Sequence, residues 1–141
     1  MLTNLFLGLT TMTVCLLLQG VLVVAALRYF ARRQDRVHSA FLAAMRVTAG
    51  LMLILILGNV AQFTAWALLF YSLGEFDSFS VAMYHSAVNF ATLGYGDMVM
   101  SPAHRMLGPL EAINGALMIG ISTAALSRAF REALQDFAQV D

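Results

Sequence analysis

Residues 78–97 read SFSVAMYHSAVNFATLGYGD, and this stretch determines how the rest of the chain is interpreted. Ser78 or Ser80 could cap a helix, because a serine side chain accepts a hydrogen bond from a free N–H group of the first helical turn. A helix of about 12 residues would then lead to TLGYGD, which is too short to cross a bilayer. We therefore expect a segment that enters the membrane and turns back.

The composition places the chain in a membrane. Of the 141 residues, 60% are hydrophobic and 11% are charged, whereas soluble domains carry roughly 25% charged residues. The net charge of zero gives no indication of a nucleic-acid partner. The single cysteine, Cys15, excludes an intrachain disulfide, and we expect it to be a small buried hydrophobic residue.

Three longer apolar segments, residues 1–27, 47–72 and 106–128, are expected to be membrane-spanning helices. At ~1.5 Å per residue each is long enough for a ~30 Å hydrocarbon core. A cleaved signal peptide is the alternative for the first segment, but no cation precedes Arg28, and a signal peptide needs a positive start.

Polar side chains mark the second and third spans. Asn59 and Gln62 are expected to form hydrogen bonds with a neighbouring helix. Glu111 lies about one turn inside the third span, and an intramembrane carboxylate is paired or functional by default. We expect it to be a structural partner behind TLGYGD, with His104 and Arg105 the nearest candidates in sequence.

The arginines predict the orientation. If the basic loop at 28–46 is cytoplasmic, three spans place the tail at 129–141 on that side as well. The N-terminus is then outside and the C-terminus inside a plasma membrane, which is the inner membrane if the cell is bacterial. The expected cytoplasmic arginines are Arg28, Arg32, Arg33, Arg36, Arg46, Arg128 and Arg131, which leaves only Arg105 outside.

The glycines of TLGYGD have two possible explanations. One is an ordinary external turn. The other starts from the rule that non-helical backbone at membrane depth must be buried in protein or line water. Gly94 and Gly96 can adopt positive φ, so the residues alternating with them can point their carbonyl groups the same way. Four copies around one axis would form stacked oxygen rings that replace the hydration shell of an ion.

TLGYGD resembles the selectivity filter of the potassium channel family, whose usual form is TVGYGD, with Leu93 in place of valine. The order of outer span, acidic turn, pore helix (79–91), filter (92–97) and inner span also resembles that family over residues 47–128. The resemblance implies an all-α membrane protein: three transmembrane helices plus a re-entrant pore helix and filter loop, assembled as a homotetramer. The K⁺-coordinating residues would be Thr92, Leu93, Gly94, Tyr95 and Gly96.

The same resemblance implies roles for the residues around the filter. Tyr84 would lie near Asp97, and His85 would lie near the hydroxyl group of Tyr95, although His85 could instead be an uncharged packing residue. Val88 stands where some bacterial members carry a glutamate that pairs with the filter aspartate.

The resemblance also implies roles on the inner helix. Gly115 would occupy the usual gating-hinge position, and Gly120 is a second inner-helix glycine. Close helix packing is the alternative for both. Thr123 would line the central cavity.

The resemblance implies a function that needs no enzyme activity and no cofactor. The expected partners are K⁺ as the permeant ion, three identical subunits and membrane lipid. Two alternatives stay open: a weakly selective cation channel, because Leu93 could loosen the filter, and a non-conducting scaffold that keeps the channel fold. The sequence contains no nucleophile–base constellation, phosphate loop or metal-ligand cluster, and the first span has no arginine ladder.

Overall fold

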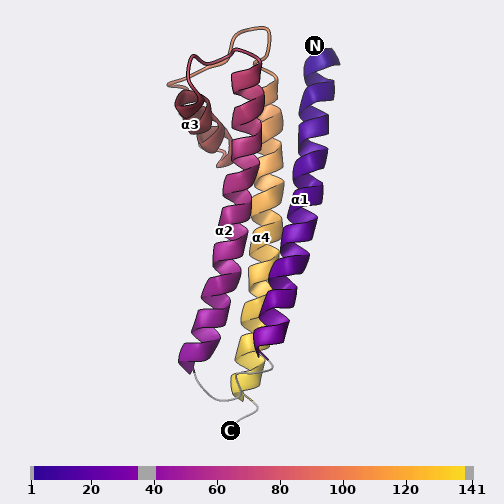
Figure 1. Ribbon diagram of the computed structural model, residues 1–141, viewed down its shortest axis with the longest axis vertical. Coiled ribbons are helices and arrows are strands. Elements are labelled where there is room, and N and C mark those ends of the chain that lie inside the picture. Colours follow the sequence, from indigo (N-terminus) through magenta and orange to yellow (C-terminus); the bar gives the residue numbers. More distant parts are fainter. Residues whose placement is uncertain (1, 35–40, 139–141) are drawn as a thin grey trace.

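The computed structural model describes residues 2–34 and 41–138, which form four helices and no strand. They are α1 (Leu2–Gln34), α2 (Phe41–Ser72), α3 (Phe79–Phe90) and α4 (Leu107–Ala138). In Figure 1 the three long helices run side by side, with α3 beside the end of α2 that leads into it. The prediction of an all-α protein with a short helix between two long ones is confirmed.

Each long helix contains a stretch that is long and apolar enough to cross a membrane. These stretches are Leu2–Arg33, Met45–Ser72 and Leu107–Glu132. The helix α3 has 12 residues, which is fewer than the roughly 20 that a spanning helix needs. The expected pattern of three spans and one short helix is therefore present in the structure.

The long helices extend beyond their apolar segments, so the predicted loop at 28–46 is wrong over most of its length. The chain stays helical to Gln34 and is helical again from Phe41. Similarly, residues 129–138 of the predicted tail continue α4. Hydropathy marks where a helix leaves the bilayer, whereas arginine and alanine favour helix in water as well. Residues 35–40 and 139–141, to which parts of both predictions refer, lie outside the described residues.

The first helix packs against α2 and α4 of its own chain. Gln19 of α1 is 1% exposed and connects all three helices. Its Nε2 donates to Ser122 Oγ of α4 at 2.8 Å, and its Oε1 accepts from Gln62 Nε2 of α2 at 2.6 Å. The predicted bond from Gln62 to a neighbouring helix is confirmed. Asn59 Oδ1, by contrast, is buried without a partner among the described residues.

Two apolar clusters hold the three long helices together at different levels. One lies towards the end where α1 finishes, and the other lies towards the α3 end and contains Cys15, which is 1% exposed as expected. The first comprises Ala26, Phe30, Val47, Leu51, Leu55, Ala125 and Ala129, and the second comprises Cys15, Trp66, Phe70, Met100 and Leu107.

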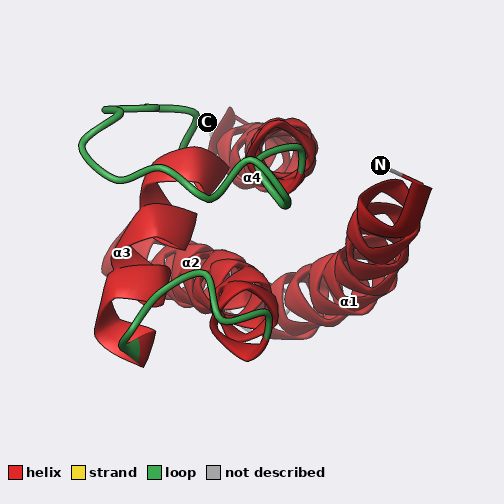
Figure 2. Ribbon diagram, turned by 90° about the horizontal axis from the view of Figure 1, so that it is seen from above, coloured by secondary structure: helices red, strands yellow, loops and turns green. Residues whose placement is uncertain are grey.

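The α3 helix and the α3–α4 loop lie away from α1. Seen along the bundle in Figure 2, α3 covers the side of α2, and the α3–α4 loop projects on the side opposite to α1. The loop that contains residues 92–97 therefore extends from the part of the molecule formed by α2, α3 and α4.

Candidate functional site

The short helix α3 positions the start of the TLGYGD segment. Ser78 has an extended backbone, and its side chain accepts a hydrogen bond from Val81 N at 3.3 Å, so it is the N-cap. At the other end, Thr92 N donates to Asn89 O at 2.8 Å and Leu93 N donates to Val88 O at 3.0 Å. These bonds terminate the helix directly at the segment, so the negative end of the helix dipole lies next to it.

The backbone of residues 92–97 alternates in handedness. Thr92, Gly94 and Gly96 have positive φ values of 59°, 57° and 73°, while Leu93 and Tyr95 lie between them. Such alternation is the geometry that allows successive carbonyl groups to point to one side. The sequence predicted positive φ at the two glycines. It did not predict it at Thr92, where a left-handed backbone costs a β-branched residue roughly 1–2 kcal/mol.

The large side chains of this segment are mostly exposed in the single chain. Leu93 is 55% exposed and Tyr95 is 65% exposed, and the neighbouring Val99 is 78% exposed. Large apolar and aromatic side chains that are exposed close together in the sequence are consistent with a surface that contacts another protein surface or lipid.

A hydrogen bond connects α3 to the end of the TLGYGD segment. Tyr84 Oη donates to Asp97 Oδ2 at 2.7 Å, which agrees with the proximity that the resemblance implied. Asp97 Oδ1 also accepts from Met98 N at 3.1 Å. The carboxylate of Asp97 is therefore held on both sides, by its own loop and by the helix behind it.

His85 has different neighbours from those expected. Its ring packs 4.8 Å from the ring of Phe76 and 5.7 Å from that of Phe70, measured between centroids. Its Nε2 lies 2.8 Å from Asn89 Nδ2. No hydrogen bond joins His85 to Tyr95 within the described residues. In a single chain, His85 is therefore placed as a packing residue, which is the alternative that the sequence left open. Val88, on the same helix, is buried at 8% exposure.

Glu111 is fully buried and pairs with α3. Its Oε1 lies within hydrogen-bonding distance of Ser86 Oγ, and Ser86 Oγ also lies 2.6 Å from Phe63 O of α2. The predicted partners His104 and Arg105 are wrong. His104 and Arg105 lie in the turn before α4, whereas Glu111 lies one turn inside α4, beside α3. Ser86 gave no signal in the sequence beyond being small and polar.

The Ser86 hydroxyl group has only one proton, and a carbonyl oxygen and an ionised carboxylate are both acceptors only. It can therefore satisfy Phe63 O and Glu111 together only if the Glu111 carboxyl group carries a proton and donates to Ser86 Oγ. The geometry consequently favours a neutral Glu111 that joins α2, α3 and α4.

A second anchor, which the sequence did not predict, holds the chain after the TLGYGD segment. The Glu75 carboxylate accepts from Ser101 N at 2.6 Å and from Ser101 Oγ at 2.7 Å, and it lies 2.5 Å from His104 Nδ1. Asn4 Nδ2 of α1 also donates to Ala103 O on the same turn. The turn at 101–104 is therefore fixed by both α1 and the loop between α2 and α3.

Hydrogen bonding controls the ionisation of Glu75. Its side chain is only 5% exposed, and this burial raises the pKa. The hydrogen bonds from Ser101 and His104 lower the pKa by more, so the net shift is downward from the ordinary value. The ionised carboxylate is therefore the stable form of this anchor.

The two glycines of α4, Gly115 and Gly120, occupy different surroundings. A Cβ atom on Gly115 would lie 2.8 Å from Phe90 Cα, so Gly115 allows α4 to approach the end of α3. A Cβ atom on Gly120 would meet nothing within 4 Å. Close packing therefore accounts for Gly115, whereas nothing among the described residues requires glycine at position 120. Thr123 is exposed, and its hydroxyl group donates to Ile119 O at 2.9 Å.

Residues 51–132 match the family model described as "Ion channel", which covers more than half of the chain. The chain therefore belongs to this family of ion channels and is a membrane protein. The matched range contains α3, the TLGYGD loop and most of α2 and α4, and it leaves α1 outside. Comparison with curated proteins and with solved structures gave no match.

Proposed function

We propose that the chain is the pore-forming subunit of a K⁺-selective channel. The observation that carries this proposal is the alternation of positive φ at Thr92, Gly94 and Gly96, directly after a helix that is too short to cross a membrane. A selectivity filter of this kind replaces the hydration shell of K⁺ with rings of backbone carbonyl oxygens. The alternation is the backbone pattern that such rings require.

The proposed conduction step is passive. K⁺ sheds water, binds successive rings of oxygens and is displaced by the next ion. The coordinating groups would be the oxygens of Thr92, Leu93, Gly94, Tyr95 and Gly96. The Tyr84–Asp97 bond at one end and the α3 terminus at the other would hold the spacing of these oxygens.

A single chain supplies one strand of the filter, so we propose a homotetramer. Leu93 and Tyr95 are more than half exposed, and irregular backbone at membrane depth must be covered by protein or line water. Three further copies around an axis beside residues 92–96 would supply that cover. The exposed apolar side chains of α4, including Ile113 and Leu117, would then face the cavity or a neighbouring subunit.

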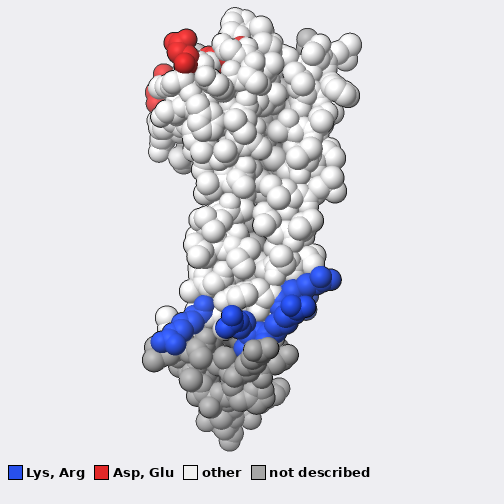
Figure 3. All heavy atoms as spheres, viewed as in Figure 1, with Lys and Arg blue, Asp and Glu red and all other residues white. Residues whose placement is uncertain are grey.

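The charge distribution supports the proposed orientation in a plasma membrane. Figure 3 shows arginines gathered at one end of the molecule and acidic side chains at the end that carries α3. Positive residues prefer the cytoplasmic side. The filter and the N-terminus would therefore be external, and the end of α4 would be cytoplasmic.

The test is ion flux through the purified channel in liposomes with opposing K⁺ and Na⁺ gradients. A reversal potential close to that of K⁺ is expected. A potential midway between the two would identify the weakly selective channel, and Leu93→Val should then increase selectivity. Absence of flux at every voltage and pH used would favour the non-conducting scaffold.

A further inference from the structure

The arginines at one end of the molecule are not equivalent. Figure 3 shows them as a band where the uncharged part of the bundle ends. Three of these arginines belong to α1, one to α2 and two to α4, and the α1 and α4 parts differ in how their charge is compensated. The described arginines of this end are Arg28, Arg32, Arg33, Arg46, Arg128 and Arg131.

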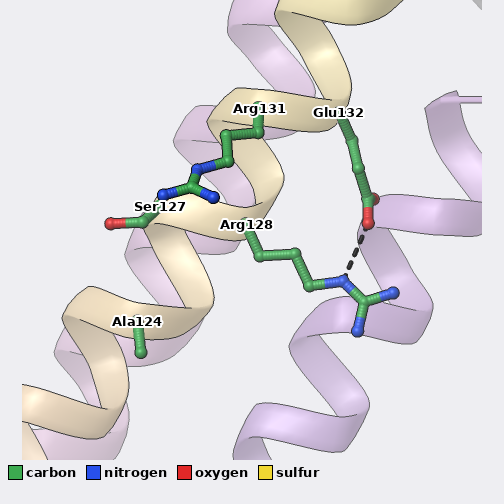
Figure 4. Close-up of a pocket in the computed structure, with 5 residues that line it drawn as sticks. All are labelled: Ala124, Ser127, Arg128, Arg131 and Glu132. Carbon is green, nitrogen blue, oxygen red and sulfur yellow. Dashed lines mark hydrogen bonds and ion pairs between the residues drawn. The ribbon is translucent and has the colours of Figure 1, made fainter.

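The α4 part is partly neutralised within the chain. Arg128 Nε donates to Glu132 Oε1 at 2.8 Å, one turn further along the helix. Figure 4 shows this pair on one side of α4, with Arg131 and Ser127 on another. Arg128 therefore already has an anionic partner.

The α1 part keeps an excess of positive charge. Within α1, residues 28–34 contain three arginines and no acidic residue. Arg28 and Arg32 are four residues apart, so they occupy the same face of the helix, where like charges repel each other. No carboxylate forms an ion pair with Arg28, Arg32 or Arg33 among the residues that the structure describes. An external anion between Arg28 and Arg32 would relieve this repulsion.

One of these arginines is positioned in advance. The Arg33 guanidinium group lies 5.7 Å from the centre of the Tyr29 ring, a cation–π distance. The Tyr29 ring packs closely against Gly50 of α2, because a Cβ atom on Gly50 would lie only 2.6 Å from Tyr29 Oη. This contact restricts the position of the ring. Ala25, Arg28, Tyr29, Arg32 and Arg33 together line one shallow groove. A side chain that is already ordered loses less entropy when it binds a ligand.

The same face of α1 becomes apolar towards the middle of the bundle. Leu17, Val21 and Val24 precede Arg28 at intervals of four, three and four residues, which is the spacing of one helical face. They are 69%, 68% and 49% exposed, respectively. A ligand bound by Arg28 and Arg32 would therefore have an apolar surface directly beside it. Soluble phosphate would use only the charged part, whereas a phospholipid would use both.

We propose that this face of α1 binds an anionic phospholipid. The guanidinium groups of Arg28 and Arg32 hold the headgroup phosphate, and Arg33 on Tyr29 adds a third charge beside it. Leu17, Val21 and Val24 contact the acyl chains. Arginine suits this role because its planar donors match a phosphate geometrically. This site does not depend on which ion the pore selects.

Lipid binding to the purified full-length channel tests the proposal without measuring ion flux. The channel is stripped of lipid in detergent, and the binding of phosphatidylglycerol and phosphatidylcholine is measured by native mass spectrometry. The variants are Arg28→Gln/Arg32→Gln and, as a control with the same change of charge, Arg128→Gln/Arg131→Gln. Each arginine removed from the site should weaken phosphatidylglycerol binding about fivefold.

The α1 double variant should therefore lose about twentyfold or more in affinity for phosphatidylglycerol. The affinity of the α4 double variant for phosphatidylglycerol should change little. The affinity of either double variant for phosphatidylcholine should also change little. Equal losses in the two double variants would show only a general effect of charge and would overturn the site. Displacement of the lipid by inorganic phosphate, at a concentration equal to that of the lipid, would show that the acyl chains contribute nothing and would also overturn it. Unchanged helical content and oligomeric state confirm that the variants are folded.

Discussion

The hydroxyl group of Tyr84, on α3, donates a 2.7 Å hydrogen bond to Oδ2 of Asp97, the last residue of the TLGYGD segment. Tyr84→Phe removes this bond and keeps the ring. We expect K⁺ conduction to decay a few times faster during sustained flux, because one restraint on the proposed filter is lost. The control is Tyr71→Phe, since the Tyr71 ring contacts Phe79 and its hydroxyl group forms no bond among the described residues. Equal behaviour of the two variants would contradict the restraint.

Gly96 and Gly74 have nearly identical φ values, 73° and 72°, but lie in different loops. An alanine at either position should cost roughly 1–2 kcal/mol in backbone strain. Gly96→Ala should abolish K⁺ selectivity or conduction, whereas Gly74→Ala should lower thermal stability and leave selectivity unchanged. Flux of K⁺ and Na⁺ in liposomes measures the selectivity of both variants, and thermal unfolding measures their stability. Normal selectivity in Gly96→Ala would exclude residues 92–96 as the filter.

Gly115 and Gly120 provide a second matched pair, on α4. Gly115→Ala places a Cβ against the backbone of Phe90, and overpacking of this kind costs about 1–3 kcal/mol. Gly120→Ala has free space around it and should stabilise the helix by up to about 1 kcal/mol. Thermal unfolding of the purified channel measures the difference. A destabilised Gly120→Ala together with a neutral Gly115→Ala would refute the packing of α4 against α3.

The Glu75 anchor predicts a loss of stability in acid. Because the pKa of Glu75 is lower in the folded protein than its ordinary value of 4.5, the carboxylate stabilises the fold fully above the unfolded pKa. That contribution is lost as the pH falls through the folded pKa. The melting temperature should therefore not vary with Glu75 ionisation above about pH 5 and should fall below it.

Glu75→Gln should remove this component of the acid dependence. Asp77→Asn is the control, because Asp77 lies in the same turn, is exposed and forms no ion pair among the described residues. Melting temperatures of the unmodified protein, Glu75→Gln and Asp77→Asn are compared across the acid pH range. An unchanged acid dependence in Glu75→Gln would show that another group is responsible.

The hydrogen bonds around Ser86 predict that Glu111 is neutral. Glu111→Gln keeps a donor for Ser86 Oγ and should leave stability nearly unchanged. Glu111→Leu keeps the volume but removes the partner, which should cost about 1–3 kcal/mol, as is usual for a buried polar group left unsatisfied. Unfolding measurements on both variants distinguish a neutral Glu111 from a charged one. If Glu111→Gln is as unstable as Glu111→Leu, the carboxylate is required in its charged form.

The sequence predicted the elements because the bilayer imposes strict rules. Apolar length identified three spans, and a cap at Ser78 or Ser80 together with the TLGYGD segment identified α3. Helix ends were predicted poorly at Gln34 and Phe41, because hydropathy follows the bilayer and not the backbone hydrogen bonds. Hydropathy therefore does not show where a helix continues beyond the bilayer into water.

The sequence by itself determined the class of fold, the position of the short helix before TLGYGD and the ability of Gly94 and Gly96 to adopt positive φ. Only the tertiary structure decided which polar groups meet. Glu111 pairs with Ser86, Glu75 with Ser101 and His104, and Gln19 with Gln62 and Ser122. Periodicity places a side chain on one face of its own helix. Which helix lies opposite, and at what height, depends on how all the helices pack together.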